Sequence, residues 1–529
     1  MDHRQSELSP MMASALTHHR AGELAEAEVL YLQLLAVAPD CFDAWHLLGV
    51  LNRQRGRLNE AIHLMERSLL INDQEPAVFN NLGVAHQAAG HRDEAETQYR
   101  RALALMPGYA DAHYNLGTLL AESGRYGEAE TSYRRAILFN PRGVEACNNL
   151  GAMLRGVGRE EEAVALYRQA VALRPSGDIY GNLGSTLRGL GQAKEAEAAY
   201  REALALNPGF VEADHNLSLL QLLQGNYEEG FARNEIRFAV GTGKKYQELV
   251  LGRFPPCGRW RGESLAGRSL LVITEQGLGD NLMMMRYLPL LKDRQLQRLS
   301  VCCHRPELLR VMGGAPGVDD VVLLEEVQHP GKLDLHCPIM SLPHLLGSRM
   351  DSIPRTVPYL RTPAGTRGFW RSRLGALEGV KVGLAWAGCY LNQDDSSRTV
   401  PLRTFAPLMR IEGICFVSLQ REEGRDELAG VGWDIVDWMD ECPDLLDTAA
   451  LVAELDLVIS VDTAMAHLAG ALGKPVWLLN RFASEWRWML DREDSPWYPG
   501  MKIFRQPHRG DWDSVIRRVA EELESRKGE

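Results

Sequence analysis

Small and apolar residues return at an interval of about 34 residues from about residue 8 to residue 240. A glycine or serine holds one slot of six units, and a small residue follows it twelve positions later; a degenerate first unit has Ala15 and Ala27 in these slots. Small side chains at paired positions let two helices pack closely, and the prolines that close most units would end the second helix. The pattern therefore predicts about seven helix–turn–helix units. The two slots hold Gly49, Gly83, Gly117, Gly151, Gly184 and Ser218, and Ala61, Ala95, Ala129, Ala163, Ala196 and Gly230.

The pattern changes after the glycine- and proline-containing stretch 241–262, which we interpret as a linker. Short apolar runs then alternate with helical patterns, as is typical of a parallel α/β sheet. The alternation restarts at Lys381, so we expect two Rossmann-like halves, 263–365 and 366–529, the second with a closing helix. The expected strands span 269–274, 299–303, 321–324 and 333–337, and then 382–386, 415–419, 433–436, 457–461 and 476–479.

One stretch, 455–479, predicts a complete strand–turn–helix–strand unit. Thr463 follows the first strand and is a good N-cap, so the N–H groups of Ala464, Met465 and Ala466 should point into the crevice beyond the strand. Such a helix start attracts phosphate, and small residues let a ligand approach. The alternative is an ordinary crossover connection with no ligand.

Composition narrows the possible functions. The formal net charge of −12 argues against a nucleic-acid partner, which needs a basic face. We expect no membrane insertion, because no run of 18 consecutive apolar residues occurs, and no secretory signal, because MDHRQSELSP lacks an apolar core. Nine scattered cysteines without a CxxC pair favour a reducing compartment, so we expect a cytoplasmic protein.

The helical units resemble the tetratricopeptide repeat. Two residues before the glycine slot stands an asparagine column, composed of Asn81, Asn115, Asn149, Asn182 and Asn216. This column looks like the ladder that holds the backbone of an acceptor polypeptide in the O-linked N-acetylglucosamine transferases. The alternative is that each asparagine caps or bridges its neighbouring repeat, and both interpretations can hold together.

The second half carries an ordered set of motifs: EQGLGD, GLAWAG, RTVPL, SLQ, VDTAMAHLAGALGKPVW and REDSPWYP. The set resembles the family-9-type, heptosyltransferase-like glycosyltransferases of the GT-B fold, and the whole chain resembles bacterial fusions of tetratricopeptide repeats to such a domain. Some of these fusions glycosylate proteins, flagellin among them. The resemblance implies two Rossmann-like domains facing a cleft, with the nucleotide sugar mainly on the second, the acceptor and catalytic base on the first, and neither metal nor cofactor.

Two departures from the family pattern put the choice of donor in doubt. The loop after Trp386 usually reads NPxHxND, and Thr399 stands where the family usually has serine. In this chain that loop instead contains Cys389, Tyr390, Asn392, Asp394 and Asp395.

The resemblance also assigns roles. Asp280 of the GxGD turn is the expected general base, although an Asp there could equally be the N-cap of the next helix. Arg398 is expected to clamp the leaving phosphate, the alternative being a salt bridge to Asp394 or Asp395. The remaining donor-binding candidates are Gly277, Gly279, Trp386, Ser418, Gln420, Asp462, Thr463, Ala464, Met465 and His467.

Within this set, Ser418 and Gln420 are candidates for the nucleobase or ribose, because they end a strand. Asp462 would be repelled by a diphosphate, so we expect it to orient the turn or accept sugar hydroxyls. For His467 a satisfied core histidine is the favoured interpretation. We expect the wall of the cleft to be packed by Trp486, Trp488, Trp497 and Tyr498.

The leading hypothesis is a cytoplasmic glycosyltransferase that moves a sugar from a nucleotide donor, by inversion, to a protein recruited by the repeats, with flagellin serine or threonine as one candidate. A second hypothesis sends the sugar to a lipid or glycan, and a third is a repeat scaffold with an inactive module. The asparagine column argues against the second. Asp280, Arg398 and the helix start at Thr463 argue against the third.

Overall fold

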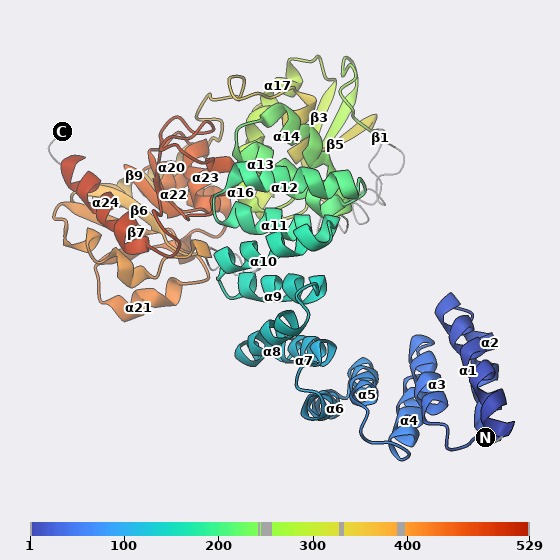
Figure 1. Cartoon of the computed structure of the whole chain (residues 1–529). Coiled ribbons are helices and arrows are strands. Elements are labelled where there is room, and N and C mark those ends of the chain that lie inside the picture. Colours follow the sequence, from blue (N-terminus) through green and yellow to red (C-terminus); the bar gives the residue numbers. More distant parts are fainter. Residues whose placement is uncertain (1–2, 242–243, 245–256, 327–332, 389–396, 527–529) are drawn as a thin grey trace. The chain divides into compact units, whose positions relative to one another are not determined.

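The computed structural model describes residues 3–241, 244, 257–326, 333–388 and 397–526 (Figure 1). The chain divides into two compact units, Met1–Leu190 and Gly191–Glu529. Most of the predicted linker and the loop from Cys389 to Asp395 lie outside the described residues. The predicted domain boundaries at 240, 262 and 365 stay predictions.

The first unit consists of paired helices, blue to teal in Figure 1. The glycine slot is explained by close packing, because a Cβ atom on Gly83 would lie 2.6 Å from the ring of Tyr99, on the following helix. Gly117 meets Tyr133 in the same way at 2.8 Å. The helices are α1 (His3–Ala21), α2 (Leu24–Val37), α3 (Phe42–Gln54), α4 (Leu58–Leu69), α5 (Pro76–Ala88), α6 (Arg92–Leu105), α7 (Ala110–Glu122), α8 (Tyr126–Phe139), α9 (Val144–Gly156), α10 (Glu160–Leu173) and α11 (Gly177–Gly189).

The second unit begins with further repeat helices: α12 (Ala193–Leu206), α13 (Val211–Leu223), α14 (Tyr227–Arg233) and the short η1 (Asn234–Ala239). These helices pack directly on the α/β part of the unit. Phe231 makes edge-to-face contacts with Trp486, at 5.6 Å between ring centroids, and with Trp497, at 6.4 Å. Arg237 forms a buried ion pair with Glu275 at 2.7 Å. The last repeats are therefore fixed to the residues that surround the strand ends.

A five-stranded parallel sheet follows, with strand order β1-β5-β2-β3-β4. The four longer strands confirm the predicted ones, whereas β1 falls at the end of the predicted linker, where two residues carry no readable pattern. The elements are β1 (Gly258–Arg259), β2 (Ser269–Ile273), α16 (Leu278–Met284), α17 (Leu288–Lys292), β3 (Arg298–Cys303), α18 (Leu309–Gly313), β4 (Asp320–Leu323), β5 (Leu335–Pro338) and α19 (Leu342–Leu345).

The second sheet has six parallel strands in the order β11-β10-β9-β6-β7-β8. Its core joins β6, β9 and β10 to the last helix through residues such as Leu384, Ile459 and Ile516. The elements are α20 (Ala364–Gly375), β6 (Val380–Ala385), β7 (Ile414–Ser418), α21 (Leu428–Val431), β8 (Ile435–Asp437), α22 (Leu445–Val452), β9 (Leu457–Val461), α23 (Ala464–Ala471), β10 (Val476–Asn480), η11 (Trp486–Trp488), β11 (Met501–Arg505) and α24 (Trp512–Ser525).

These elements confirm the predicted fold class, a helical repeat array followed by two parallel sheets. In the second sheet the chain runs outward from β6 to β7 and β8, and later returns to pair β9 on the other side of β6. In open parallel sheets, ligands bind beyond the carboxyl ends of the strands at such a reversal of order. The topology therefore predicts a ligand site at the residues that follow β6 and β9.

Candidate functional site

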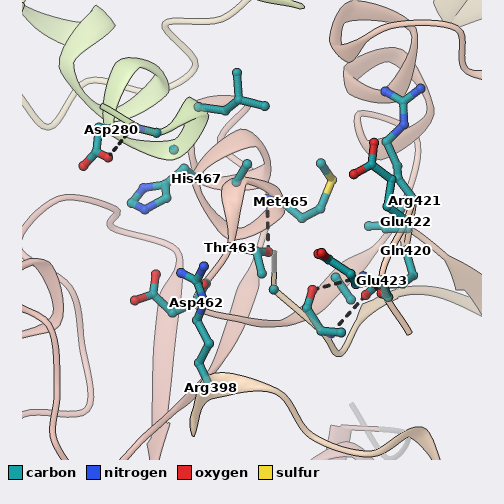
Figure 2. Close-up of a pocket in the computed structure, with 18 of the residues that line it drawn as sticks. Asp280, Arg398, Gln420, Arg421, Glu422, Glu423, Asp462, Thr463, Met465 and His467 are labelled. Carbon is teal, nitrogen blue, oxygen red and sulfur yellow. Dashed lines mark hydrogen bonds between the residues drawn. The ribbon is translucent and has the colours of Figure 1, made fainter. Parts of the chain in front are cut away.

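A pocket of about 690 Å³ lies at this reversal point. Its lining comes from the ends of seven strands and the segments that follow them, two strands of the first sheet and five of the second. The lining residues are Gly277–Asp280 after β2, Arg305 and Glu307 after β3, Ala385 at the end of β6 and Ala387, Gly388 and Arg398 after it, Leu419–Glu423 after β7, Pro443 after β8, Asp462–Met465 and His467 after β9, and Arg481, Glu485 and Arg487 after β10. Both sheets thus contribute to one pocket (Figure 2).

The start of α23 forms the floor of the pocket next to β9. Thr463 is the N-cap, as predicted, and its Oγ1 accepts a hydrogen bond from the Met465 amide at 3.3 Å. The prediction that three amides would be available was wrong for two of them. The Met465 amide is capped, and the Ala466 amide donates to the Thr463 carbonyl at 3.2 Å. The helix start therefore presents its positive end through Ala464 and the partly engaged first turn.

Arg398 reaches the same floor from the chain after β6. Its Nη1 donates to the carbonyl of Asp462 at 3.1 Å, beside the helix start (Figure 2). Gly388 makes room for it, because a Cβ atom at this position would lie 2.5 Å from the Arg398 Nε. The alternative prediction, a salt bridge to Asp394 or Asp395, involves residues outside the described part of the chain.

The carboxyl group of Asp462 is buried near two arginines, Arg398 and Arg487. Burial raises the pKa of its carboxyl above the ordinary value, and the neighbouring Arg487 opposes that rise. A carboxyl group that takes up a proton more readily repels an anion less strongly. The direction of this shift lessens the repulsion between Asp462 and a phosphate at the helix start.

Asp280 faces this floor from the first sheet's side of the pocket, where Figure 2 shows it on the pale green ribbon. The N-cap of α16 is Gly277, so the interpretation of Asp280 as the N-cap was wrong. Asp280 is instead the third residue of the helix, in its first turn, and its Oδ2 accepts the Gly277 amide at 3.0 Å. Its Oδ1 forms an ion pair with Arg487. The carboxylate is thus held at the pocket wall by one contact from each half.

His467 is a buried and satisfied side chain, as favoured from the sequence. Its Nδ1 lies 2.9 Å from the Tyr498 hydroxyl, and its ring stacks on Trp488 with 5.0 Å between centroids. Burial lowers its pKa well below the ordinary value, with nearby arginines adding to the effect, so the imidazole is neutral. Gly279 packs directly on it, since a Cβ there would lie 2.6 Å from the His467 Cδ2. This contact fixes the distance between α16 and α23.

Three predicted donor-binding residues act mainly as supports. Trp386 and Ser418 are fully buried and do not line the pocket. Gln420 lines it, but its Oε1 accepts the amides of Trp386 and Ala387, both at 3.0 Å. Its Nε2 donates to the carbonyls of Ala387 at 3.0 Å and Glu423 at 2.7 Å. Because this amide is fully engaged, a ligand here would meet the backbone that Gln420 holds in place.

Several pocket residues were missed from the sequence. Arg305, Arg421 and Arg481 each follow a strand end, and that position alone was a signal for a ligand-facing side chain. Arg487 gave no such signal, because it lies within an aromatic-rich stretch that we interpreted as packing. The four aromatic side chains Trp486, Trp488, Trp497 and Tyr498 are buried behind the lining residues.

The asparagine column braces the repeats. Each amide donates to the residue that precedes the column position of the previous repeat: Asn81 to His46 at 2.9 Å, Asn115 to Asn80 at 2.9 Å, Asn149 to Tyr114 at 3.2 Å and Asn182 to Asn148 at 3.2 Å. The inter-repeat interpretation is thus confirmed for these four, while Asn216 lies half-buried on α13.

The same helices also enclose a second pocket of about 350 Å³. Asn81, Tyr114 and Asn115 line it, together with residues at the start of α7 and α9. The column residues are only half-buried, and a side-chain amide has one acceptor oxygen and two donor hydrogens, of which the bond from Asn115 to Asn80 uses one hydrogen. Bracing therefore does not consume their whole hydrogen-bonding capacity.

Two further properties bear on the site. Among residues 3–241, 257–326, 333–388 and 397–526, no group of three or more His, Cys, Asp or Glu side chains could hold a metal ion. Within the helices that the structure describes, none is long and apolar enough to cross a lipid bilayer.

Comparison with known proteins found similarity to two families, each in a different part of the chain. Models of the tetratricopeptide repeat match residues 40–108, 80–140, 144–174 and 177–210. The model of glycosyltransferase family 9 (heptosyltransferase) matches residues 443–509, which contain β9, α23 and β10. The chain therefore combines a segment similar to tetratricopeptide repeats with a segment similar to the heptosyltransferases of glycosyltransferase family 9.

A curated relative is similar to about half of this chain. Protein FlbA of Caulobacter vibrioides is 29% identical over 334 residues, which cover 55% of this chain and 54% of FlbA. The chain thus spans about half the length of that relative. Among solved structures, the type IV pilus biogenesis factor PilW covers 40% of this chain and 98% of its own, with 19% identity and a TM-score of 0.37. Pseudomonas aeruginosa pilF covers 40% and 93%, with 20% identity and a TM-score of 0.35.

Proposed function

We propose that the protein is a GT-B glycosyltransferase that moves a sugar from a nucleotide-activated donor to a polypeptide held by the repeats. One observation carries this proposal: the start of α23, Arg398 and Asp280 meet in a single pocket at the carboxyl ends of two parallel sheets. The match of the family 9 model to the segment that contains α23 supports it. FlbA, the curated relative, supports it only for the part of the chain that it covers.

The donor's phosphate groups would lie between the start of α23 and the guanidinium of Arg398. A helix start and an arginine are both suited to this, the first through its dipole and the second through paired N–H donors. In the proposed step the acceptor oxygen forms a bond to the anomeric carbon while the bond from that carbon to the phosphate oxygen breaks. The electron pair leaves with the phosphate, where Arg398 and the helix start stabilise the added charge. A single displacement of this kind inverts the anomeric centre.

Asp280 would take the proton from the acceptor hydroxyl. It faces the pocket from the opposite sheet, which is where an acceptor must lie if the donor occupies the second sheet. A carboxylate that accepts this proton as the new bond forms contributes about 10²- to 10⁴-fold to the rate. The arginines of the pocket supply the positive charge, so the proposed step uses no metal ion, and transfer in the presence of EDTA checks this assignment.

The repeat array would hold an extended acceptor along the asparagine column. Asn81 and Asn115 line the 350 Å³ pocket of the array and keep hydrogen-bonding capacity beyond their inter-repeat bonds. Amide side chains pair with the backbone of any polypeptide, so this surface favours a protein over a lipid acceptor. Serine or threonine of flagellin is the first candidate, suggested by the family resemblance.

The donor site is tested by nucleotide binding. A panel of nucleoside diphosphates is screened by thermal shift, because a ligand that binds only the folded state raises its stability. We expect at least one to stabilise the protein and Arg398→Ala to weaken its calorimetric affinity about 10- to 100-fold, the range for a charge-assisted contact. Arg403→Ala is the matched control, because Arg403 is exposed and outside the pocket. Equal affinity of the wild type and a folded Arg398→Ala variant would place the phosphate site elsewhere.

A further inference from the structure

An arginine that follows strand β10 of the second sheet forms an ion pair with the proposed base, Asp280. Arg487 in η11 forms an ion pair with the Asp280 Oδ1, and its Nη1 lies 3.8 Å from the Glu485 Oε2. The side chains of Arg487 and Asp280 are only 14% and 12% exposed. This ion pair spans the pocket from the segment after β10 to α16. Asp280, which must accept a proton in the proposed step, is therefore paired with Arg487 from the half of the pocket that would bind the donor.

Arg487 also interacts with three carboxyl groups of the pocket, those of Asp280, Glu485 and Asp462. Burial alone would lower its pKa, but Asp280, Glu485 and Asp462 outweigh burial and raise it, so the guanidinium is always charged. Asp462 directly precedes Thr463, the N-cap of α23. Arg487 is thus paired with Asp280 and is close enough to Asp462, the residue before the helix start, to interact with its charge.

We propose that Arg487 is a positioning residue that exchanges partners, holding Asp280 before the donor binds and turning to the donor's phosphate when that anion enters. The inference rests on the proposed function, because it takes the phosphate to lie at the start of α23. The exchange leaves the Asp280 Oδ1 facing the acceptor hydroxyl, while its Oδ2 stays fixed by the Gly277 amide at 3.0 Å. The base is then exposed only when the donor is in place.

The exchange has a clear physical basis. A diphosphate carries more negative charge than one carboxylate, and its oxygens match the paired N–H donors of a guanidinium. Arg487 is held in a largely buried position, so its choice lies between the partners within the pocket. A phosphate must therefore compete with Asp280 for Arg487, and part of its binding free energy is used to break the ion pair.

This competition gives a test with inorganic pyrophosphate as the probe, measured by calorimetry. Asp280→Asn replaces the charged partner of Arg487 with a neutral one, so we expect it to bind pyrophosphate about three- to tenfold more tightly than the wild type. Arg487→Gln should bind at least about tenfold more weakly. In the Asp280→Asn, Arg487→Gln double variant the gain from Asp280→Asn should disappear, because the released cation is no longer present.

Asp280→Asn removes a negative charge from the pocket, and this alone could strengthen the binding of pyrophosphate, so a matched control is needed. Glu307 lines the same pocket, and the described ion pairs include none between it and Arg487. Glu307→Gln should change the affinity less than Asp280→Asn does, and its effect should persist when Arg487 is replaced. Arg487→Lys serves as a second variant if Arg487→Gln does not fold, since it keeps the charge but loses paired donors.

Two results would overturn the inference alone. One is wild-type or weaker pyrophosphate affinity in a folded Asp280→Asn variant, as a purely structural tie between α16 and η11 would give. The other is a gain from Asp280→Asn that persists without Arg487. If the wild type itself does not bind pyrophosphate, the proposed phosphate site fails, and the inference falls with it.

Discussion

The asparagine column allows one prediction in which stability and acceptor binding are separable. Replacing Asn115, Asn149 and Asn182 by alanine removes three inter-repeat hydrogen bonds of 2.9 to 3.2 Å. Asn115→Ala should lower the free energy of unfolding most, by about 1–3 kcal/mol, because it leaves the buried Asn80 oxygen without that donor. The other two bonds end on half-buried partners, so we expect about 0.5–1.5 kcal/mol for each.

Denaturant unfolding of the single variants measures these values, and Asn72→Ala is the control. Asn72 is partly exposed and accepts only a local bond from the Gln74 amide at 3.0 Å. Acceptor binding is measured at a temperature where every variant remains folded. If the column holds the acceptor backbone, the triple variant should lose transfer to the protein acceptor about 10-fold or more while its nucleotide affinity stays at the wild-type value.

Two results would refute this reasoning. Unchanged stability of Asn115→Ala would show that the inter-repeat bonds contribute nothing to folding. Wild-type transfer by a folded triple variant would limit the column to bracing and remove the argument for a polypeptide acceptor.

Two further predictions concern the α/β part of the chain. Gly388→Ala places a Cβ atom 2.5 Å from the Nε of Arg398, so calorimetry should show nucleotide affinity reduced by about tenfold with little change in melting temperature. The control, Gly365→Ala, has open space around the new Cβ atom and should change neither quantity, whereas wild-type affinity in Gly388→Ala would show that the placement of Arg398 is unimportant. The depressed pKa of His467 predicts acid sensitivity, because below about pH 6.5 the unfolded state takes up a proton that the folded state does not, so stability is lost as the pH falls, by at most about 1.4 kcal/mol per unit. Denaturant unfolding between pH 7.5 and 5.5 should show this loss in the wild type and less of it in His467→Gln, which can still bond to Tyr498; equal slopes would contradict the assignment.

The repeat array and the central strand–helix–strand unit could be predicted because their signals are local and periodic. The glycine slot recurs because a tyrosine ring fills the space beside it, as at Gly83 and Tyr99. The start of α23 was predictable because Thr463 lies two residues beyond a largely apolar strand and can bond to the second amide after it. Strand β11 was not predicted because its five residues include Lys502 and Arg505 and show no long apolar run.

The pocket was only partly predictable, because its contacts join residues far apart in the chain. Asp280 and Arg487 are separated by 207 positions, and nothing in either neighbourhood indicates the other. The role of Gln420 was equally hidden, since its amide hydrogen-bonds to the backbone of Trp386 and Ala387, which follow a different strand, β6. Residue type and position relative to a strand end indicate which residues can face a pocket, but the partner of each side chain depends on tertiary packing.

The central claim is that this pocket transfers sugar to a protein with Asp280 as the base. It is tested most directly by incubating flagellin from the same organism with the full chain and a panel of nucleotide sugars, and by measuring the intact mass of the flagellin with time. We expect a mass increase of one or more sugar residues, and transfer about 10²-fold slower or more with folded Asp280→Asn, because the hydroxyl proton then has no acceptor. Transfer by Asp280→Asn at the wild-type rate would contradict the role of Asp280. A flagellin of unchanged mass with every donor would contradict flagellin as the acceptor.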